Sequence, residues 1–192
     1  MRRNGNVIFL IGCLLVLGSF TLLVFSRLQV SRSAAKAVEL AAQLEDILPP
    51  RTPGIPEAYT NMEMPAISVN GYDFIGIVEI PAFQTALPIG SVWDSGTVSS
   101  FPCRFWGTVY DSSLILGGAD QTGQFDFLKQ IQHGDSVLVT DMTGAEFSYR
   151  VERIIRTTSA DAEILLEQDS DLILFARQAR SPEYIIVRCA AG

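Results

Sequence analysis

Asp171–Cys189 has the sequence DLILFARQARSPEYIIVRC, in which two short apolar runs flank a polar segment. Both runs, DLILF and YIIVRC, are rich in leucine, isoleucine and valine and show little alternation between apolar and polar positions. Continuous apolar runs of this length, bounded by turn residues, are typical of strands that are buried on both faces. The sequence therefore predicts two central β-strands near the end of the chain.

Other short β-like runs precede this region, and most of them end at proline, glycine or aspartate. These runs are Phe74–Ile80, Leu114–Leu116, Ser136–Thr140 and Glu146–Ile155. Only Gln124–Gln132 has the pattern of a short helix, with Phe127, Leu128 and Ile131 facing inward. Many short strands separated by turn signals predict a mainly β fold, in the form of a closed or nearly closed β-barrel with short helices.

The N-terminal region predicts a membrane anchor. Val7–Phe25 is a run of 19 residues without a charge, which is long enough to span a hydrocarbon core. A cleaved signal peptide is the alternative, since a small-residue site exists at Ala35–Ala37, but its apolar region would be shorter. Arg2 and Arg3 favour a cytoplasmic N-terminus. We expect a single-pass protein of the cell membrane whose C-terminal domain is extracytoplasmic.

The segments between the anchor and the β-rich region predict a helix and a spacer. In residues 28–48, small and apolar residues recur at helical spacing, which predicts a stalk helix or a weak self-association face. That face consists of Ala34, Val38, Ala41, Leu44 and Leu48. Residues 49–66 hold five of the nine prolines and predict an extended linker. The expected organisation is an anchor at 1–27, a helix at 28–48, a linker at 49–66 and a β-barrel domain at 67–192.

Composition excludes several kinds of function. The formal net charge is −7, which argues against nucleic acid as a partner because phosphate binding needs clustered lysine and arginine. The chain has one histidine, His133, and three cysteines, of which Cys13 lies in the apolar run. These residues do not form a metal-ligand pattern. The acidic stretch Asp161–Asp171 is expected to be a solvated loop, and we expect no metal site and no cofactor.

Three segments, in this order, resemble the sortases. They are FIGIVEIPAF…LPI from Phe74, CRFWGTVYDSSLILGGADQTGQFDFLKQIQHGDSV at Cys103–Val137, and the quoted stretch Asp171–Cys189. The resemblance covers about residues 72–189 and is strongest to the class B-like sortases of Gram-positive bacteria. It implies a sortase-like closed β-barrel and, for active members of the family, a cysteine transpeptidase that joins a sorting-motif peptide to an amine.

The resemblance also locates the positions at which the family has its histidine, cysteine and arginine. The histidine position is Ala119, the cysteine position is Arg177 and the arginine position is Tyr184. Shifting the alignment by one residue would place Ala176 at the cysteine position or Glu183 at the arginine position. No nearby alignment therefore restores a thiol or an imidazole. Transpeptidation needs a thiolate nucleophile, a group for proton transfer and an oxyanion donor. The family's chemistry is therefore expected to be absent.

Other residues of the expected site have more than one interpretation. Arg177 and Asp120 are predicted to form a salt bridge across the former catalytic site, and Arg180 is the nearest other basic candidate. Trp93 and Trp106 either line a peptide groove or belong to the core. His133 is predicted to be an exposed turn residue.

Cys103 and Cys189 are the two cysteines of the predicted domain. Each is an inert buried thiol, half of a disulfide between them, or a displaced nucleophile.

Three functions are compatible with this sequence. The first is a catalytically degenerate sortase homologue that binds a sorting-motif peptide, a pilin or an active sortase in surface-protein or pilus assembly. The second is an active sortase-type transpeptidase with atypical residues. The third is a structural subunit of a membrane assembly complex. Ala119 and Arg177 argue against the second function, and the sequence does not separate the first from the third.

Overall fold

The computed structural model describes residues 35–54, 62–94, 96–158, 165, 170–179 and 181–192, together with Leu15, Val16 and Ser19. The chain divides into two compact units, Met1–Arg32 and Ser33–Gly192. Within the described residues, no helix is long and apolar enough to cross a bilayer. Nearly all of the predicted anchor, Val7–Phe25, lies outside the described residues, so it stays a prediction.

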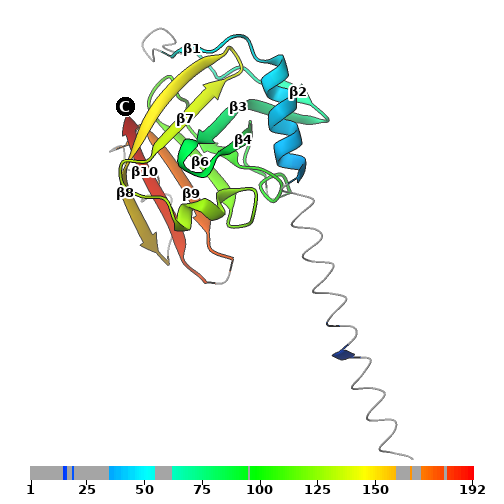
Figure 1. Ribbon diagram of the computed structural model, residues 1–192, viewed down its shortest axis with the longest axis vertical. Helices are drawn as coiled ribbons and strands as arrows, with labels where there is room; N and C mark the ends of the chain where they lie inside the picture. Colours follow the sequence, from blue (N-terminus) through cyan, green and yellow to red (C-terminus); the bar gives the residue numbers. More distant parts are fainter. Residues whose placement is uncertain are drawn as a thin grey trace, which may run out of the picture. The chain divides into compact units, whose positions relative to one another are not determined.

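Eight strands of the second unit form a closed ring (Figure 1). Around the ring the order is β8, β10, β9, β6, β5, β4, β3 and β7, and β7 pairs back onto β8. The short strands β1 and β2 extend the sheet beside β8 and β3. This ring confirms the predicted mainly β, closed barrel.

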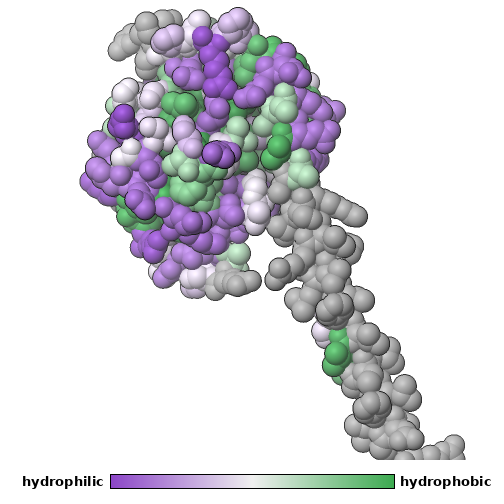
Figure 2. Space-filling view, in the orientation of Figure 1, coloured by the Kyte–Doolittle hydropathy of each residue, from purple (hydrophilic) through white to green (hydrophobic). Residues whose placement is uncertain are grey.

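The strands are β1 Thr52–Pro53, β2 Ile67–Val69, β3 Tyr72–Ile80, β4 Thr85–Gly90, β5 Cys103–Trp106, β6 Leu114–Ala119, β7 Ser136–Asp141, β8 Ala145–Thr157, β9 Leu172–Arg177 and β10 Tyr184–Ala191. Two short 3₁₀ helices are η2 Pro81–Phe83 and η3 Phe125–Lys129. The predicted helix at Gln124–Gln132 is thus shorter than expected and of the 3₁₀ type, although Phe127, Leu128 and Ile131 are buried as predicted. Hydrophilic residues cover much of the face shown in Figure 2.

Strands β6, β9 and β10 are neighbours in the sheet and are buried on both faces. Toward the barrel interior, Leu116, Leu174 and Val187 join the main hydrophobic core. On the outer face, Ile173 and Phe175 belong to a second apolar cluster. Burial on both faces explains why these strands show no alternation in the sequence, and it confirms the prediction of two central strands.

The helix at 35–47 packs against the barrel through a stripe of apolar side chains. Ala37, Leu40, Ala41 and Leu44 are buried, and Leu40 and Leu44 share a cluster with side chains of β3. The predicted stripe was partly wrong, since Val38 is 60% exposed. The buried stripe shares Ala41 and Leu44 with the predicted face but has Leu40 in place of Val38, because the larger leucine side chain buries more apolar area.

The described parts of the predicted linker also contact the barrel. β1 pairs in parallel with β8, and Met64 is buried in the main core. Arg51 forms ion pairs with Glu45 at 3.0 Å, with Glu146 at 3.1 Å and with Glu79. These residues belong to the compact unit Ser33–Gly192, and the domain boundary at residue 67 stays a prediction.

Candidate functional site

Three strands bring Ala119, Arg177 and Tyr184 into one row. Strands β6 and β9 run parallel, and their last residues, Ala119 and Arg177, are register partners. Strand β10 runs antiparallel to β9 and begins at Tyr184, which is the partner of Arg177 on the other side. We call these three residues the strand-end row. The structure thus places side by side the three residues that the resemblance aligned with a histidine, a cysteine and an arginine.

The strand-end row contains neither a thiol nor an imidazole. Ala119 is half-buried and has no group that exchanges a proton, whereas Arg177 is exposed. A guanidinium group stays protonated in proteins, so it donates hydrogen bonds but does not act as a nucleophile. Tyr184 is half-buried and provides a phenolic hydroxyl. The row can bind a partner group through Arg177 and Tyr184, but it lacks the thiolate that acyl transfer by a sortase requires.

Asp120, which follows the row, pairs with a residue other than the one predicted. Its Oδ1 lies 2.5 Å from Nζ of Lys129 in η3, in a geometry that fits an ion pair rather than a directed hydrogen bond. Its Oδ2 accepts a hydrogen bond from the backbone N–H of Ala179 at 2.9 Å. The predicted Asp120–Arg177 salt bridge was therefore wrong. The Asp120 side chain is buried and turns toward η3, whereas Arg177 is exposed and forms no ion pair among the described residues.

Gln124 is a site residue that the sequence did not reveal. Its side chain is 1% exposed, and its Oε1 accepts a hydrogen bond from the backbone N–H of Ala119 at 3.0 Å. The Nε2 atom of Gln124 has no hydrogen-bond partner among the described residues. Gln124 therefore fixes the end of β6, where the resemblance places the family's histidine. A polar residue directly after Gly123 was the only local signal for this contact.

Cys103 and Cys189 are separate, free and buried thiols. Cys103 lies in the cluster that faces the helix at 35–47, and Cys189 lies in the main core of the barrel. Burial raises the pKa of each thiol to about 12. The disulfide that the sequence left open is not formed, and neither thiol belongs to the strand-end row.

His133 lies in the turn that precedes β7 and is exposed, as the sequence predicted. Together with Glu152, Arg153, Ser170 and Arg188 it lines a small polar cavity of about 270 Å³. None of these residues belongs to the strand-end row. His133 is therefore separate from the residues that the resemblance aligns with the family's catalytic positions.

Trp93 covers the outer face of β6 and β9. Its ring stacks on Phe175 with a centroid distance of 5.5 Å and meets Phe105 edge-on at 5.6 Å. The Trp93 ring also lies directly over Gly117, where an added Cβ would come within 2.1 Å of Cζ3. Trp93 thus fits both interpretations that the sequence left open. Its ring covers the outer apolar cluster, as a core residue would, and it is 38% exposed, as a groove residue would be.

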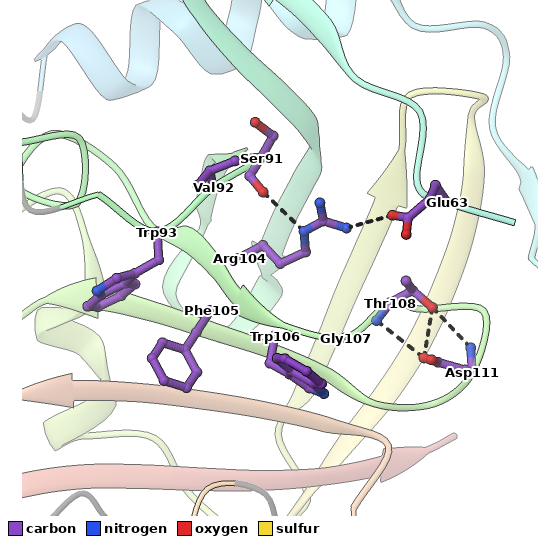
Figure 3. A pocket seen from close by; sticks show the side chains of 10 residues that line it. All are labelled: Glu63, Ser91, Val92, Trp93, Arg104, Phe105, Trp106, Gly107, Thr108 and Asp111. Atoms are coloured by element: carbon purple, nitrogen blue, oxygen red, sulfur yellow. Dashed lines mark hydrogen bonds and ion pairs between the residues drawn. The ribbon is translucent and has the colours of Figure 1, made fainter. Parts of the chain in front are cut away.

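Trp106 is the second predicted groove residue, and it is 60% exposed. It lines a cleft of about 480 Å³ that lies between the chain after β4 and strand β5 (Figure 3). Trp93, Arg104 and Glu63 line the same cleft. The structure therefore brings Trp93 and Trp106 together, at a cleft that the strand-end row does not line. Arg180 lies outside the described residues, as does most of the acidic stretch Asp161–Asp171.

Comparison with solved structures identifies the fold. The structure resembles sortase A from Corynebacterium diphtheriae, with a TM-score of 0.54 and 16% identity over 85% of this chain and 84% of that chain. Similarity to Streptococcus agalactiae sortase C1 has a TM-score of 0.54 and 20% identity, over 62% of this chain and 69% of that chain. A Clostridium perfringens sortase D5 transpeptidase matches with a TM-score of 0.52 and 18% identity, over 66% and 82% of the two chains.

These identities establish the fold and not the activity. The chain has the sortase fold, as the resemblance predicted. The three structures named above are sortases of the types A, C1 and D5. No family model matches the sequence, and no curated protein matches it.

Proposed function

We propose that this sortase-fold chain is a catalytically degenerate sortase homologue, anchored in the membrane, that binds a peptide or protein partner in surface-protein or pilus assembly. The strand-end row carries the proposal. Its residues Ala119, Arg177 and Tyr184 meet at the ends of β6 and β9 and the start of β10, where the resemblance places the catalytic residues. Without a thiolate there, the acyl-enzyme intermediate has no atom on which to form.

The remaining cysteines and the histidine do not supply a substitute. At neutral pH, a thiol with a pKa of about 12 is ionised in fewer than about one molecule in ten thousand, so Cys103 and Cys189 are poor nucleophiles. Both lie inside apolar clusters, and His133 lies in the turn before β7. Neither described cysteine is therefore paired with His133 as a nucleophile and base.

A binding role fits what the site retains. Arg177 is exposed beside the half-buried Tyr184, and a guanidinium and a phenol are side chains that recur in protein-recognition sites. The predicted anchor at Val7–Phe25 would tether the domain to the membrane. A sorting-motif peptide, a pilin or an active sortase is the partner class that the resemblance suggests.

The test compares the full-length chain in detergent with a variant that restores the family's residues. Sorting-motif peptides and an amine acceptor are added, and mass spectrometry follows cleavage and any acyl adduct on the protein. We expect no turnover and no adduct for the natural chain, and an adduct on residue 177 of the A119H/R177C/Y184R variant. Turnover by the natural chain would overturn the proposal. If the turnover persisted in a C103A/C189A double variant, it would indicate a new chemistry. If the turnover were lost in that variant, it would indicate a displaced cysteine nucleophile.

A further inference from the structure

The sheet opens between β4 and β5, and this opening forms the cleft shown in Figure 3. The two strands share a single pair of register partners, Gly90 and Cys103. Beyond that pair β4 has ended, while β5 continues to Trp106 and has a strand partner only on its β6 side. The segment Ser91–Trp93 forms one wall and Arg104–Trp106 forms the other. We call this opening the β4–β5 cleft.

Exposed apolar side chains concentrate at the β4–β5 cleft. Six large apolar side chains are exposed in the described part of Ser33–Gly192, and three of them line the cleft. These three are Val92 at 65%, Trp93 at 38% and Trp106 at 60% exposure. Clustered exposed apolar residues commonly mark an interaction site, and tryptophan is enriched among residues that dominate binding energy. The cleft therefore has the properties of a binding site.

The charges at the cleft favour a cationic ligand. Arg104 is already engaged, because its Nε donates to the backbone oxygen of Ser91 at 3.0 Å and its guanidinium lies 3.5 Å from Glu63. Glu63 is 87% exposed at its side chain, so one carboxylate oxygen remains open to solvent. Although partial burial raises the pKa of Asp111, hydrogen bonds from Ser113 and Thr108 hold it below its ordinary value. Two carboxylates and one engaged arginine leave the cleft negative, in a chain whose net charge is −7.

We propose that the β4–β5 cleft binds an extended peptide segment that carries a basic side chain. The unpaired edge of β5 accepts the peptide backbone as an added strand. The ammonium or guanidinium group of the peptide lies against the exposed ring of Trp106 and is attracted by Glu63 and Asp111. The cleft contains no residue of the strand-end row, so this inference does not depend on the loss of catalysis.

Titration calorimetry on the full-length chain in detergent tests this proposal with three matched peptides. The peptides are TVKVT, TVEVT and the same sequence with norleucine at the centre, each capped at both ends. We expect TVKVT to bind at least about fivefold more tightly than the norleucine peptide, and TVEVT to bind weakest, because a cation–π contact and two carboxylates each contribute a few-fold. Raising the salt concentration is expected to reduce the difference between the peptides.

Variants locate the binding. W106A is expected to weaken TVKVT binding about tenfold, W106F to retain most of it, and the E63Q/D111N pair to remove the preference for lysine over norleucine. V38A, at an equally exposed apolar residue on the helix, is the matched control and is expected to have no effect. Equal binding of the three peptides, no TVKVT binding at millimolar concentration, or unchanged binding by W106A would each overturn the proposal. Preferential binding of a neutral oligosaccharide would also overturn it. Transpeptidase turnover, by contrast, would overturn only the proposed function.

Discussion

The indole ring of Trp93 lies on the backbone of Gly117, and this contact is possible because residue 117 has no side chain. A side chain at residue 117 would place its Cβ within 2.1 Å of Trp93 Cζ3 and 2.7 Å of Phe175 Cζ. Gly117 is on β6, two residues before the strand-end row, and Trp93 is on the segment that follows β4. The ring therefore covers the outer face of β6 and β9 only because glycine leaves room for it.

Replacing Gly117 by alanine is expected to displace Trp93. The added methyl group cannot be accommodated without moving an aromatic ring, which costs about 1–3 kcal/mol of unfolding free energy. Denaturant unfolding measures this loss, and tryptophan fluorescence reports the greater exposure of the ring. In a W93A background the same substitution should cost less, since the closest clash is gone and only the 2.7 Å approach to Phe175 remains. An equal cost in both backgrounds would contradict the contact.

Native-state thiol labelling tests the burial of the cysteines. In a C13S background, Cys103 and Cys189 are expected to react with a thiol reagent far more slowly than a free cysteine at pH 7.5, because both are buried and have a pKa of about 12. The rate should rise about tenfold per pH unit between pH 7 and 9, with no plateau. R177C adds an exposed thiol and serves as the positive control. Fast labelling of either natural cysteine would contradict this description.

The same raised pKa values predict a loss of stability at alkaline pH. Burial raises the pKa of Cys103 and Cys189 from 9.0 to about 12, so above pH 9 the unfolded chain releases protons that the folded chain keeps. Burial also raises the pKa of Tyr149, which adds to the effect. The contribution is therefore fully present below pH 9 and is lost as the pH rises toward 12. Unfolding free energy measured from pH 8 to 11 should fall, and the fall should be smaller for C189A than for the natural chain.

The sequence was sufficient to predict a strand and its burial where one local pattern of residues determined both. Asp171–Phe175 and Tyr184–Cys189 are apolar at almost every position, and only strands that are buried on both faces tolerate that composition. The three residues of the strand-end row came from the resemblance to the family, and the register of β6, β9 and β10 brings them side by side.

The sequence was insufficient where a contact depended on the direction of a side chain. Asp120 is adjacent to the row, yet it turns toward Lys129, nine residues later on η3. Nothing in a linear sequence separates that direction from one toward Arg177. The helix at 35–47 gives a second case, because a face through Val38 and a face through Leu40 both have helical spacing and share Ala41 and Leu44. The position of the barrel, which the sequence does not show, decided which face was buried.

The hydrogen bond between Tyr110 and Asp141 is expected to stabilise the barrel strongly. Asp141 is fully buried and accepts a hydrogen bond from the Tyr110 hydroxyl at 2.6 Å, as well as from Thr143 and the N–H of Ala145. Tyr110→Phe removes a hydrogen bond to a charged group and should cost about 1.5–3 kcal/mol. Tyr72→Phe, at a partly exposed hydroxyl near Lys36, is the control and should cost less than about 0.5 kcal/mol. Chemical denaturation compares the two, and equal losses would contradict the assignment.

The ion pair of Asp120 with Lys129 is expected to hold the turn between β9 and β10. Lys129→Met leaves a carboxylate that is 3% exposed and whose one remaining partner among the described residues is the Ala179 N–H. Losing a fully buried partner costs about 3–5 kcal/mol, but Lys129 is 46% exposed, so solvent reduces the expected loss to about 1–3 kcal/mol. Lys129→Arg keeps the charge and should lose little, and Asp120→Asn combined with Lys129→Met should recover part of the loss. Denaturation gives the free energies, and amide exchange at Ala179 reports the turn. If Lys129→Met leaves both quantities unchanged, the ion pair does not hold the turn beside Arg177.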